Sequence, residues 1–408
     1  MTDSTPSHAR NVTQPPSLAR SQRLPRVLRD VLCLTDFEAK ARRQLPRPIF
    51  GYIAGAAEDN RSLQDNRSVF DDYGFTTRTL VDVSQRSQAV ELFGQRYSSP
   101  FGIAPMGIHA LSTYRGDLVL AEAASQAGIV SIMSGTSLIP METVAQAAPS
   151  TWFQAYLPGD PARIEALVAR VAQAGFKTLV VTVDIPVAAN RENNVRTGFS
   201  TPLHPSLRLA WDGLTRPSWL VGTLLRTWLN HGMPHFENSF ATRGAPIVSR
   251  HVQRDFSARD HLNWGHLAQI RRQWPGPLVI KGILSVADAR KAQAHGADAI
   301  ILSNHGGRQL DGAASPLRLL APVVQAVGDM PVLIDSGFRR GSDVLKALAL
   351  GARMVFVGRP FNYAAAVAST AGVLHAISLL RDEVDRNMAM LGVNRCAELT
   401  PECLVMTR

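Results

Sequence analysis

Eight short, largely apolar runs recur along the last three quarters of this 408-residue chain, with Ala/Leu-rich stretches of helical character between most of them. Apolar runs bounded by helices are typical of the strands of a parallel sheet whose two faces are both covered. The runs occupy residues 100–105, 129–134, 151–156, 178–184, 277–282, 299–304, 331–337 and 354–358. Eight such strands alternating with helices predict a (β/α)8 TIM barrel of the α/β class.

A doubly wound open sheet would show the same alternation. That fold is less favoured, because no G-x-G-x-x-G follows the first predicted strand. We expect residues 31–408 to form a single barrel domain with an N-terminal helical extension. Residues 1–30 are rich in Ser, Pro, Arg and Gln, and they predict a flexible basic tail.

One connection is much longer than the others. About 95 residues separate the fourth strand from the fifth, which exceeds an ordinary strand-to-helix connection. We therefore predict an insertion over residues 196–254, which contains Trp211, Trp219 and Trp228. Aromatic rings beside basic side chains favour the interfacial layer of a membrane. A lid over the site and a contact with a neighbouring subunit remain alternatives.

The net charge of +10 is concentrated in two segments. Residues 1–48 hold nine basic and four acidic side chains, residues 196–254 hold seven and two, and the rest of the chain is neutral. No nucleic-acid-binding motif accompanies either segment, so we expect no nucleic-acid partner. An anionic membrane surface suits them at least as well.

Other features narrow the location of the protein. No run of about 18 uncharged apolar residues occurs, so no transmembrane helix is predicted. The N-terminus lacks the apolar core of a secretion signal. Cys33, Cys396 and Cys403 match no zinc or disulfide spacing, so we expect no metal and a reducing compartment. We expect a cytoplasmic protein, peripheral on the inner face of the cytoplasmic membrane.

Polar or small residues follow every predicted strand at the same end. A lone histidine after a strand is commonly a loop residue, and a glycine pair commonly marks a turn. In barrels, however, the active site lies at the C-terminal ends of the strands, and here all eight ends carry such groups. They are Pro105, Met106, Gly107, Ser134, Gln154, Tyr156, Thr182, Asp184, Lys281, Ser303, His305, Arg308, Asp335, Gly358 and Arg359.

The stretch "SNHGGRQLDG" resembles a signature of the FMN-dependent α-hydroxy acid dehydrogenase and oxidase family. "YIAGAAEDN", "TVDIP", "VIKGI", "DSGFRRGSDVLKALALGA" and "VGRP" support the resemblance in the expected order, from residue 36 to the C-terminus. It implies FMN as cofactor and oxidation of an L-2-hydroxy acid to the 2-keto acid. Electrons would pass to a quinone or another acceptor, with an oxygen-using oxidase as the alternative. We also expect a homotetramer.

The resemblance implies roles for the residues that would act on the substrate. His305 would be the general base, since the ordinary pKa of histidine lies near physiological pH. Asp184 would pair with the imidazolium. Arg308 and Arg191 would clamp the substrate carboxylate through their forked guanidinium groups. Tyr52 and Tyr156 would offer hydroxyls to that carboxylate and to the α-oxygen.

The remaining residues would hold FMN. Lys281 would stabilise the negative charge that develops on the reduced flavin. Ser134, Gln154 and Thr182 would bond the pyrimidine edge, and Ser303 and Asp335 the flavin or its ribityl chain. Main-chain groups of Ser336, Gly337 and Gly358, with Arg339 and Arg359, would bind the phosphate. Pro105, Met106 and Gly107 would line the flavin through their backbone.

Two positions depart from the family pattern. Met106-Gly107 stands where many relatives have Thr or Val before Gly or Ala, and Met106 cannot donate a side-chain hydrogen bond. Thr136 stands where some oxidases have a bulky aromatic residue, which indicates room for larger substrates. The insertion looks like that of the membrane-associated mandelate and lactate dehydrogenases.

Three other classes of function are less favoured by the sequence. Other FMN barrels lack the His-Gly-Gly-Arg arrangement that binds a small carboxylate. A catalytically silent flavin scaffold would not need the base, its acidic partner and both arginines together. Nucleic-acid binding would rest on the basic segments alone. The colour of the purified protein discriminates among them, because the leading hypothesis predicts a yellow protein that a hydroxy acid bleaches without oxygen.

Overall fold

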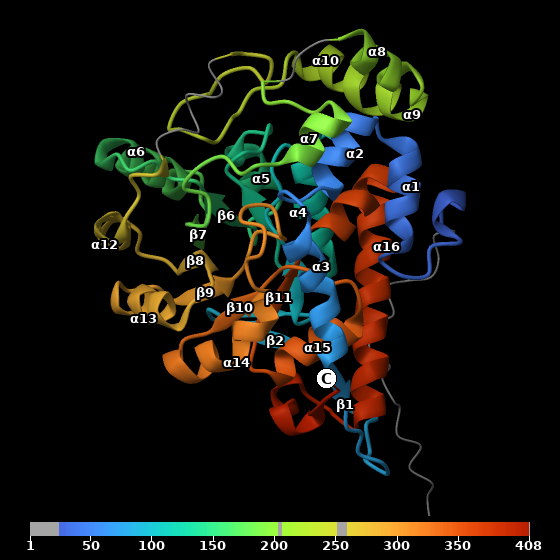
Figure 1. Ribbon diagram of the computed structural model, residues 1–408, viewed down its shortest axis with the longest axis vertical. Coiled ribbons are helices and arrows are strands. Elements are labelled where there is room, and N and C mark those ends of the chain that lie inside the picture. The colour runs from blue at the N-terminus through green and yellow to red at the C-terminus, as the bar shows by residue number, and fades with distance from the viewer. Residues whose placement is uncertain (1–23, 203–205, 251–258, 408) are drawn as a thin grey trace, which may run out of the picture.

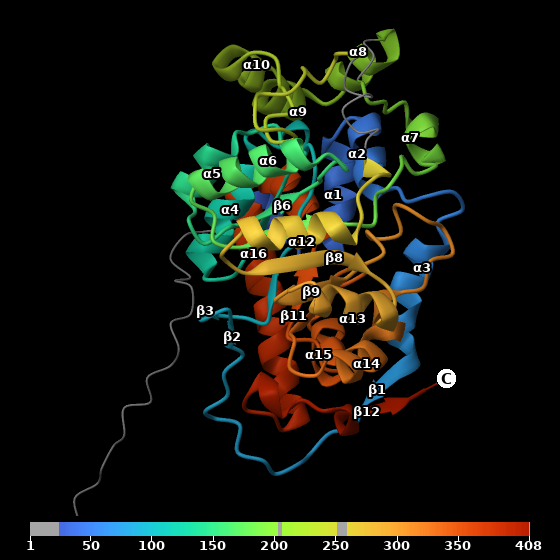
Figure 2. The same ribbon diagram turned by 90° about the vertical axis from the view of Figure 1, so that its left-hand side faces the viewer.

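Eight parallel strands form the centre of the molecule, which is a computed structural model describing residues 24–202, 206–250 and 259–407 (Figures 1 and 2). The strands are β4 (Phe101–Ile103), β5 (Ile132–Ser134), β6 (Trp152–Ala155), β7 (Leu179–Thr182), β8 (Leu278–Ile283), β9 (Ala299–Leu302), β10 (Val332–Ile334) and β11 (Met354–Val357). They pair in the order β4–β11–β10–β9–β8–β7–β6–β5. A parallel bridge between Ile103 and Ser131 joins the two ends of that order. The predicted (β/α)8 barrel is confirmed.

Helices follow the strands and pack around the barrel. Along the chain these are α4 (Gly116–Ala127), α5 (Met141–Ala147), α6 (Pro161–Gln173), α12 (Trp264–Gln273), α13 (Val286–Ala294), α14 (Pro316–Val327), α15 (Gly341–Ala349) and α16 (Arg359–Leu391). Helix α6 shows why they begin where they do. The Asp160 carboxylate accepts the N–H groups of Ala162 and Arg163 at 3.0 and 3.1 Å, and Pro161 fits the first helical position.

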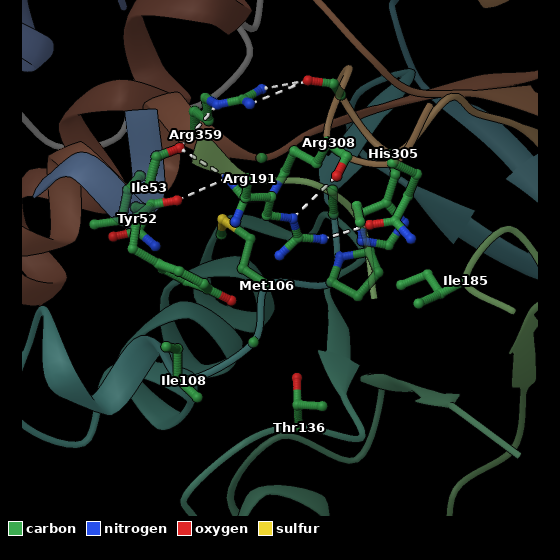
Figure 3. Close-up of a pocket in the computed structure, with 18 of the residues that line it drawn as sticks. Tyr52, Ile53, Met106, Ile108, Thr136, Ile185, Arg191, His305, Arg308 and Arg359 are labelled. Carbon is green, nitrogen blue, oxygen red and sulfur yellow. Dashed lines mark hydrogen bonds between the residues drawn. The ribbon is translucent and has the colours of Figure 1, made fainter. Parts of the chain in front are cut away.

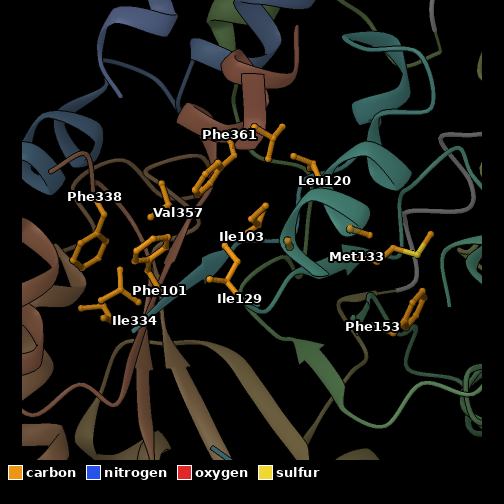
Figure 4. Packing of buried hydrophobic residues seen from close by; sticks show 14 of the residues in the cluster. Phe101, Ile103, Leu120, Ile129, Met133, Phe153, Ile334, Phe338, Val357 and Phe361 are labelled. Atoms are coloured by element: carbon orange, nitrogen blue, oxygen red, sulfur yellow. The ribbon is translucent and has the colours of Figure 1, made fainter. Parts of the chain in front are cut away.

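The apolar core has two parts, inside and outside the barrel wall. Val180, Val279, Ile301, Leu333 and Phe356 belong to the inner cluster. The hairpin of β2 (Val90–Leu92) and β3 (Gln95–Tyr97) contributes Leu92 and Tyr97 to it. The outer cluster lies between the strands and the helices (Figure 4). Each strand is thus apolar on both faces, which is why the sequence shows continuous runs rather than alternation.

The N-terminal segment packs against helix α16 and against the loops at the C-terminal ends of the strands. It contains η1 (Arg26–Leu28), α1 (Asp36–Gln44), α2 (Arg47–Ala54), α3 (Arg61–Ser68) and η2 (Val69–Asp72). Strand β1 (Tyr73–Phe75) then pairs antiparallel with β12 (Leu404–Met406), near the C-terminus. Of the predicted flexible tail, residues 1–23 lie outside the described residues. Leu28 is fully buried in η1, so the folded part begins before residue 31.

The long connection between β7 and β8 forms a helical unit at one end of the barrel. It contains α7 (Glu192–Thr197), α8 (Leu207–Leu214), α9 (Pro217–Trp219), the π-helical η4 (Leu220–Leu225) and α10 (Arg226–His231), and α8 to α10 lie at the top of Figure 1. The Trp219 indole N–H donates to the Leu111 carbonyl at 2.7 Å, next to η3 (His109–Leu111) and the loop that follows β4. The Tyr114 hydroxyl lies 2.9 Å from a ring nitrogen of His231.

Apolar side chains on the outer side of this unit face solvent. Leu207, Trp211, Leu214, Val221, Trp228 and Leu229 are each at least 62% exposed. We call these six side chains the outer apolar patch.

Helix α16 is the one described helix long and apolar enough to cross a membrane. It bends at Ala368 and Ser369, and 56% of its most apolar window is buried. Its contacts are with α1, α4 and α15, so it belongs to the helical layer around the barrel.

Candidate active site

A cavity of 910 Å³ opens at the C-terminal ends of the barrel strands (Figure 3). Its walls bring together fifteen of the predicted site residues: Tyr52, Pro105, Met106, Gly107, Tyr156, Arg191, Lys281, His305, Arg308, Asp335, Ser336, Gly337, Arg339, Gly358 and Arg359. The other five predicted residues, Ser134, Gln154, Thr182, Asp184 and Ser303, lie behind this wall. Four of them, Ser134, Gln154, Asp184 and Ser303, hydrogen-bond a lining residue or one another, as described below.

His305 and Asp184 form a pair at the edge of this cavity. The imidazole Nδ1 lies 3.0 and 3.2 Å from the two carboxylate oxygens, and both side chains are largely buried. Burial lowers the pKa of His305, although Asp184 opposes that shift. Burial alone would raise the pKa of Asp184, but the charges of His305 and Lys281 lower it instead. The imidazole is therefore neutral at pH 7, and its Nε2 is left as the nitrogen that can accept a proton.

The backbone explains why two glycines follow the histidine. His305 has φ +57°, and Gly306 and Gly307 have φ +66° and +74°. Three successive residues in the left-handed region turn the chain sharply, and side chains larger than hydrogen are strained there. A Cβ on Gly307 would also lie 2.6 Å from the main-chain nitrogen of Leu63. The loop therefore brings His305 to the cavity and packs against α3.

Two arginines bind the carboxyl-terminal end of helix α2. Arg308 donates to the carbonyl oxygens of Tyr52 and Gly55 at 2.7 and 2.8 Å. Arg359 donates to those of Ile53 and Gly55, both at 2.9 Å. The last carbonyls of a helix lack helical partners and carry partial negative charge, which suits guanidinium groups. Helix α2 thus holds two cations in the cavity wall.

The cavity carries an excess of positive charge. Burial lowers the pKa of Arg359 to about 9 and that of Arg191 to about 10. Every hydrogen bond of Arg359 to the described residues goes to a main-chain carbonyl. Buried cations held by neutral groups are stabilised when an anion binds between them. The wall therefore suits anionic ligands such as a phosphate or a carboxylate.

Lys281 has an acidic partner. Its Nζ lies 2.9 Å from Asp335 and donates to the Ser303 hydroxyl at 2.8 Å. Burial alone would lower the pKa of Lys281, but the charges of Asp335 and Asp184 raise it. The Ser336 hydroxyl donates to Asp335 at 2.9 Å and accepts the Gly306 N–H at 3.1 Å. This network links the ends of β8, β9 and β10 around a fixed ammonium group.

Two polar groups at the strand ends have no hydrogen-bond partner among the described residues. The Gln154 Nε2 and Thr182 Oγ1 atoms are both buried, while the Ser134 hydroxyl donates to the other amide atom of Gln154 at 3.1 Å. Buried polar groups are nearly always bonded, so these atoms indicate a ligand with hydrogen-bonding groups. Flavin carries such groups on its pyrimidine edge. With Lys281 and the phosphate-compatible arginines, the residues present fit FMN.

Arg259 is a cavity residue that sequence reasoning missed. Its guanidinium lies 4.4 Å from the centre of the Tyr156 ring, at the end of the long connection. Burial lowers the pKa of Arg259 to about 10, and burial raises that of Tyr156 to about 12. A cation over an aromatic face is attracted to it, so Arg259 holds Tyr156 at the cavity edge.

Comparisons with known proteins agree with this geometry. The FMN-dependent dehydrogenase family matches residues 41–406. (S)-Mandelate dehydrogenase of Pseudomonas putida is 38% identical over 376 residues, which cover 90% of this chain and 92% of the relative. L-Lactate dehydrogenase of Ectopseudomonas mendocina is 39% identical over 381 residues, covering 92% and 98%. The crystal structure of the monotopic membrane protein (S)-mandelate dehydrogenase superposes with a TM-score of 0.87 at 37% identity, covering 92% of this chain and all of that one.

Proposed function

This chain belongs to the FMN-dependent dehydrogenases, and from that premise we propose that it oxidises an L-2-hydroxy acid to the 2-keto acid and passes the electrons to a quinone. The observation that carries the proposal is one cavity holding a neutral imidazole, its buried carboxylate partner and two guanidinium groups. A base and a carboxylate clamp are what a 2-hydroxy acid requires, since it must lose a proton while its carboxylate stays fixed.

We assign the proton transfer to His305. Its Nε2 accepts a proton from the substrate, and Asp184 stabilises the imidazolium that forms, because the carboxylate already contacts Nδ1. Bound FMN supplies the acceptor for the two electrons that leave the substrate. The other proton of the oxidation leaves from the same carbinol group, so substrate and product differ by two electrons and two protons.

The substrate carboxylate is assigned to Arg191 and Arg308. Arg191 donates through Nε to the Arg308 carbonyl at 3.0 Å, so the two residues are held as one unit. Tyr52 lies beside them, with the Arg308 guanidinium 4.8 Å from its ring. The hydroxyls of Tyr52 and Tyr156 would then contact the carboxylate and the α-oxygen, which fixes the carbinol carbon next to His305.

The cofactor is assigned to the rest of the cavity. Lys281, Gln154, Thr182 and Ser134 would bond the flavin ring, and Ser303 and Asp335 the ring or ribityl chain. Arg339 and Arg359, with the main chain of Ser336, Gly337 and Gly358, would hold the phosphate. The positive φ of Gly337, +88°, supports this assignment, since it exposes main-chain groups without a side chain in the way.

The substrate side chain would lie against apolar residues. Ile185, Val187, Phe199 and Phe236 line the cavity together with Thr136. We propose a 2-hydroxy acid with a bulky apolar side chain, such as mandelate, over lactate or glycolate. Apolar lining of this kind stabilises an aromatic ring by removing its surface from water.

We also propose that the outer apolar patch rests on an anionic membrane surface. The basic residues Arg216 and Arg226 lie on the same helical unit. Exposed tryptophans and leucines beside cations favour the boundary between acyl chains and headgroups. A position at the membrane would bring the flavin near quinone, which favours a dehydrogenase over an oxygen-using oxidase.

Anaerobic bleaching tests the proposal. The purified yellow protein is mixed without oxygen with the L and D enantiomers of mandelate and lactate, and with the achiral glycolate, and flavin absorbance is followed. We expect rapid bleaching by the L enantiomer of a bulky acid, followed by rapid reoxidation by a soluble quinone and slow reoxidation by oxygen. No bleaching by any 2-hydroxy acid would refute the activity, and fast reoxidation by oxygen would favour the oxidase.

A further inference from the structure

Two adjacent residues of helix α3 contact the two loops that form the candidate site. Asn66 contacts the loop after β9, which carries His305, and Arg67 contacts the loop after β10, which carries Gly337. We propose that Asn66 and Arg67 are positioning residues with separate tasks, Asn66 for proton transfer and Arg67 for cofactor phosphate binding. The inference rests on the proposed roles of the two loops.

Asn66 forms a reciprocal amide pair with Asn304, the residue before His305. Each side-chain amide donates to the oxygen of the other at 2.8 Å, and the two residues are 0% and 3% exposed. The Asn304 oxygen also accepts the Gly307 N–H at 3.0 Å, and its amide nitrogen donates to the Ala314 carbonyl at 3.2 Å. Asn66 therefore fixes the orientation of an amide that precedes His305 and binds the loop after it, at Gly307 and Ala314.

The hydrogen bonds of Asn66 and Asn304 hold His305 in a strained backbone conformation. A non-glycine residue at positive φ, such as His305, is strained and persists only where its surroundings hold it. Without Asn66, the Asn304 amide loses two buried hydrogen bonds and can rotate. The Gly307 N–H then loses the side-chain one of its two acceptors and keeps only the Asn304 main-chain carbonyl at 3.0 Å, so the turn that brings His305 to the cavity can relax.

Arg67 acts on the neighbouring loop. Its guanidinium donates to the Gly337 carbonyl, and to the buried Asp343 carboxylate at 2.8 Å. The same oxygen of Asp343 accepts the N–H groups of Arg339 and Arg340 at 2.8 and 3.0 Å. Arg67 thus closes a network around the segment from Gly337 to Arg340, which is the proposed phosphate loop.

Helix α3 and the proposed phosphate loop are also in close contact. A Cβ on Gly337 would lie 1.9 Å from the Asn66 carbonyl oxygen, so only glycine fits between α3 and the cavity. The main chain of Asn66 therefore limits how far the phosphate loop can move outward, while the two side chains direct the two loops separately.

The first test is a double-mutant cycle on the rate of anaerobic flavin reduction, using Asn66→Ala, Asn304→Ala and the double variant. We expect each single change to slow reduction by about a hundredfold, since a misplacement of about 1 Å has that effect. FMN should remain bound. The double variant should be no slower than the slower single variant, because the two residues act through one contact. Fully multiplied losses, or wild-type rates in Asn66→Ala, would overturn the assignment.

The second test is the release of FMN from diluted holoenzyme, followed by its fluorescence. Arg67→Ala should release FMN at least about tenfold more readily, with Arg67→Lys partly restoring retention because it keeps the charge but loses the fork. The cofactor that remains bound should be reduced by substrate at the wild-type rate. Unchanged release, or slow reduction of the bound fraction, would overturn the role of Arg67.

A matched control lies on the same helix. Gln64 is exposed on α3, and Gln64→Ala should change neither measurement. If Asn66→Ala does not fold, Asn66→Ser keeps a small polar group and is judged by the same rate. Failure of any hydroxy acid to bleach the wild-type protein would refute the proposed function. If the wild-type protein is bleached, slow reduction in Asn66→Ala and FMN release from Arg67→Ala test only the roles of these two α3 residues.

Discussion

The imidazole of His305 lies at the meeting point of a strained backbone and a buried carboxylate. Its removal should abolish flavin reduction by the substrate and leave the folded structure unchanged. In His305→Gln the side chain can still contact Asp184, but it has no nitrogen that accepts a proton. We predict normal FMN binding and flavin reduction at least about a thousandfold slower, the upper range of losses for a general base. Stopped-flow absorbance measures this rate, and near-wild-type reduction would exclude His305 as the base.

The pH dependence should report the buried imidazole. Burial lowers the pKa of His305 below its ordinary 6.5, and only the neutral form can accept a proton. The reduction rate should therefore rise with pH through a midpoint below 6.5 and stay level above it. Asp184→Asn removes a charge that raises this pKa, so the midpoint should move further toward acid while the plateau falls. A midpoint above 6.5, or a shift toward alkali in the variant, would contradict the assignment.

Arg308 should serve the substrate rather than the cofactor. Arg308→Lys keeps the charge but cannot donate to the end of α2 and to a carboxylate as a fork does. We predict retained FMN, and a substrate concentration for half-maximal reduction raised at least about tenfold, the value of one lost charged hydrogen bond. Release of FMN by this variant would instead place Arg308 at the phosphate.

Much of the candidate site could be predicted at the level of single residues, because the carboxyl ends of barrel strands meet at one rim; Tyr52 and Arg191, which follow no strand, came from the family resemblance. Three contacts could not. Arg259 belongs to no motif, and its approach to Tyr156 depends on the path of the long connection. The donation of Arg308 and Arg359 to the end of α2, and the pairing of Asn66 with Asn304, join residues far apart in sequence. Such contacts follow from packing, which short-range patterns do not encode.

At the scale of elements, the eight strands could be predicted because a strand that is buried on both faces has a continuous apolar run in its sequence. Seven of the eight strands are shorter than those runs, since the last residues of several runs bend away to form the site, whereas β8 is as long as its run. The helices of the insertion could not be placed. Their apolar side chains face solvent as well as the barrel, so the usual link between apolar periodicity and burial fails there.

Membrane binding by the insertion should be separable from FMN binding by the barrel. We predict that the intact chain floats with anionic liposomes at low salt and less so at high salt, since screening weakens attraction to headgroups. A chain whose residues 203–240 are replaced by a short linker should stay at the bottom while still binding FMN. Trp211→Ser with Trp228→Ser is a milder variant that should reduce flotation. An intact chain that never floats would support a lid or a subunit contact instead.

At the scale of the whole molecule, the site is assembled from both ends of the chain. Asn66 and Asn304 are 238 positions apart, Arg67 and Gly337 are 270 apart, and β1 pairs with β12. Such distant pairings form slowly, because loop closure costs entropy before any contact compensates it. In refolding experiments we predict that circular dichroism recovers first and that FMN fluorescence is quenched only in the last phase. Quenching within the earliest phase would contradict this order.

The docking of α2 and α3 onto the strand ends has a further consequence for the newly made chain. Helix α2, whose carbonyls accept hydrogen bonds from Arg308 and Arg359, leaves the ribosome early. Both arginines emerge only after most of the barrel has been synthesised. For most of translation the α2 carbonyls and the Asn66 amide have no partners. We therefore expect nascent chains to be unable to capture the cofactor until synthesis is almost complete, which would delay flavin-dependent electron transfer until the enzyme is whole.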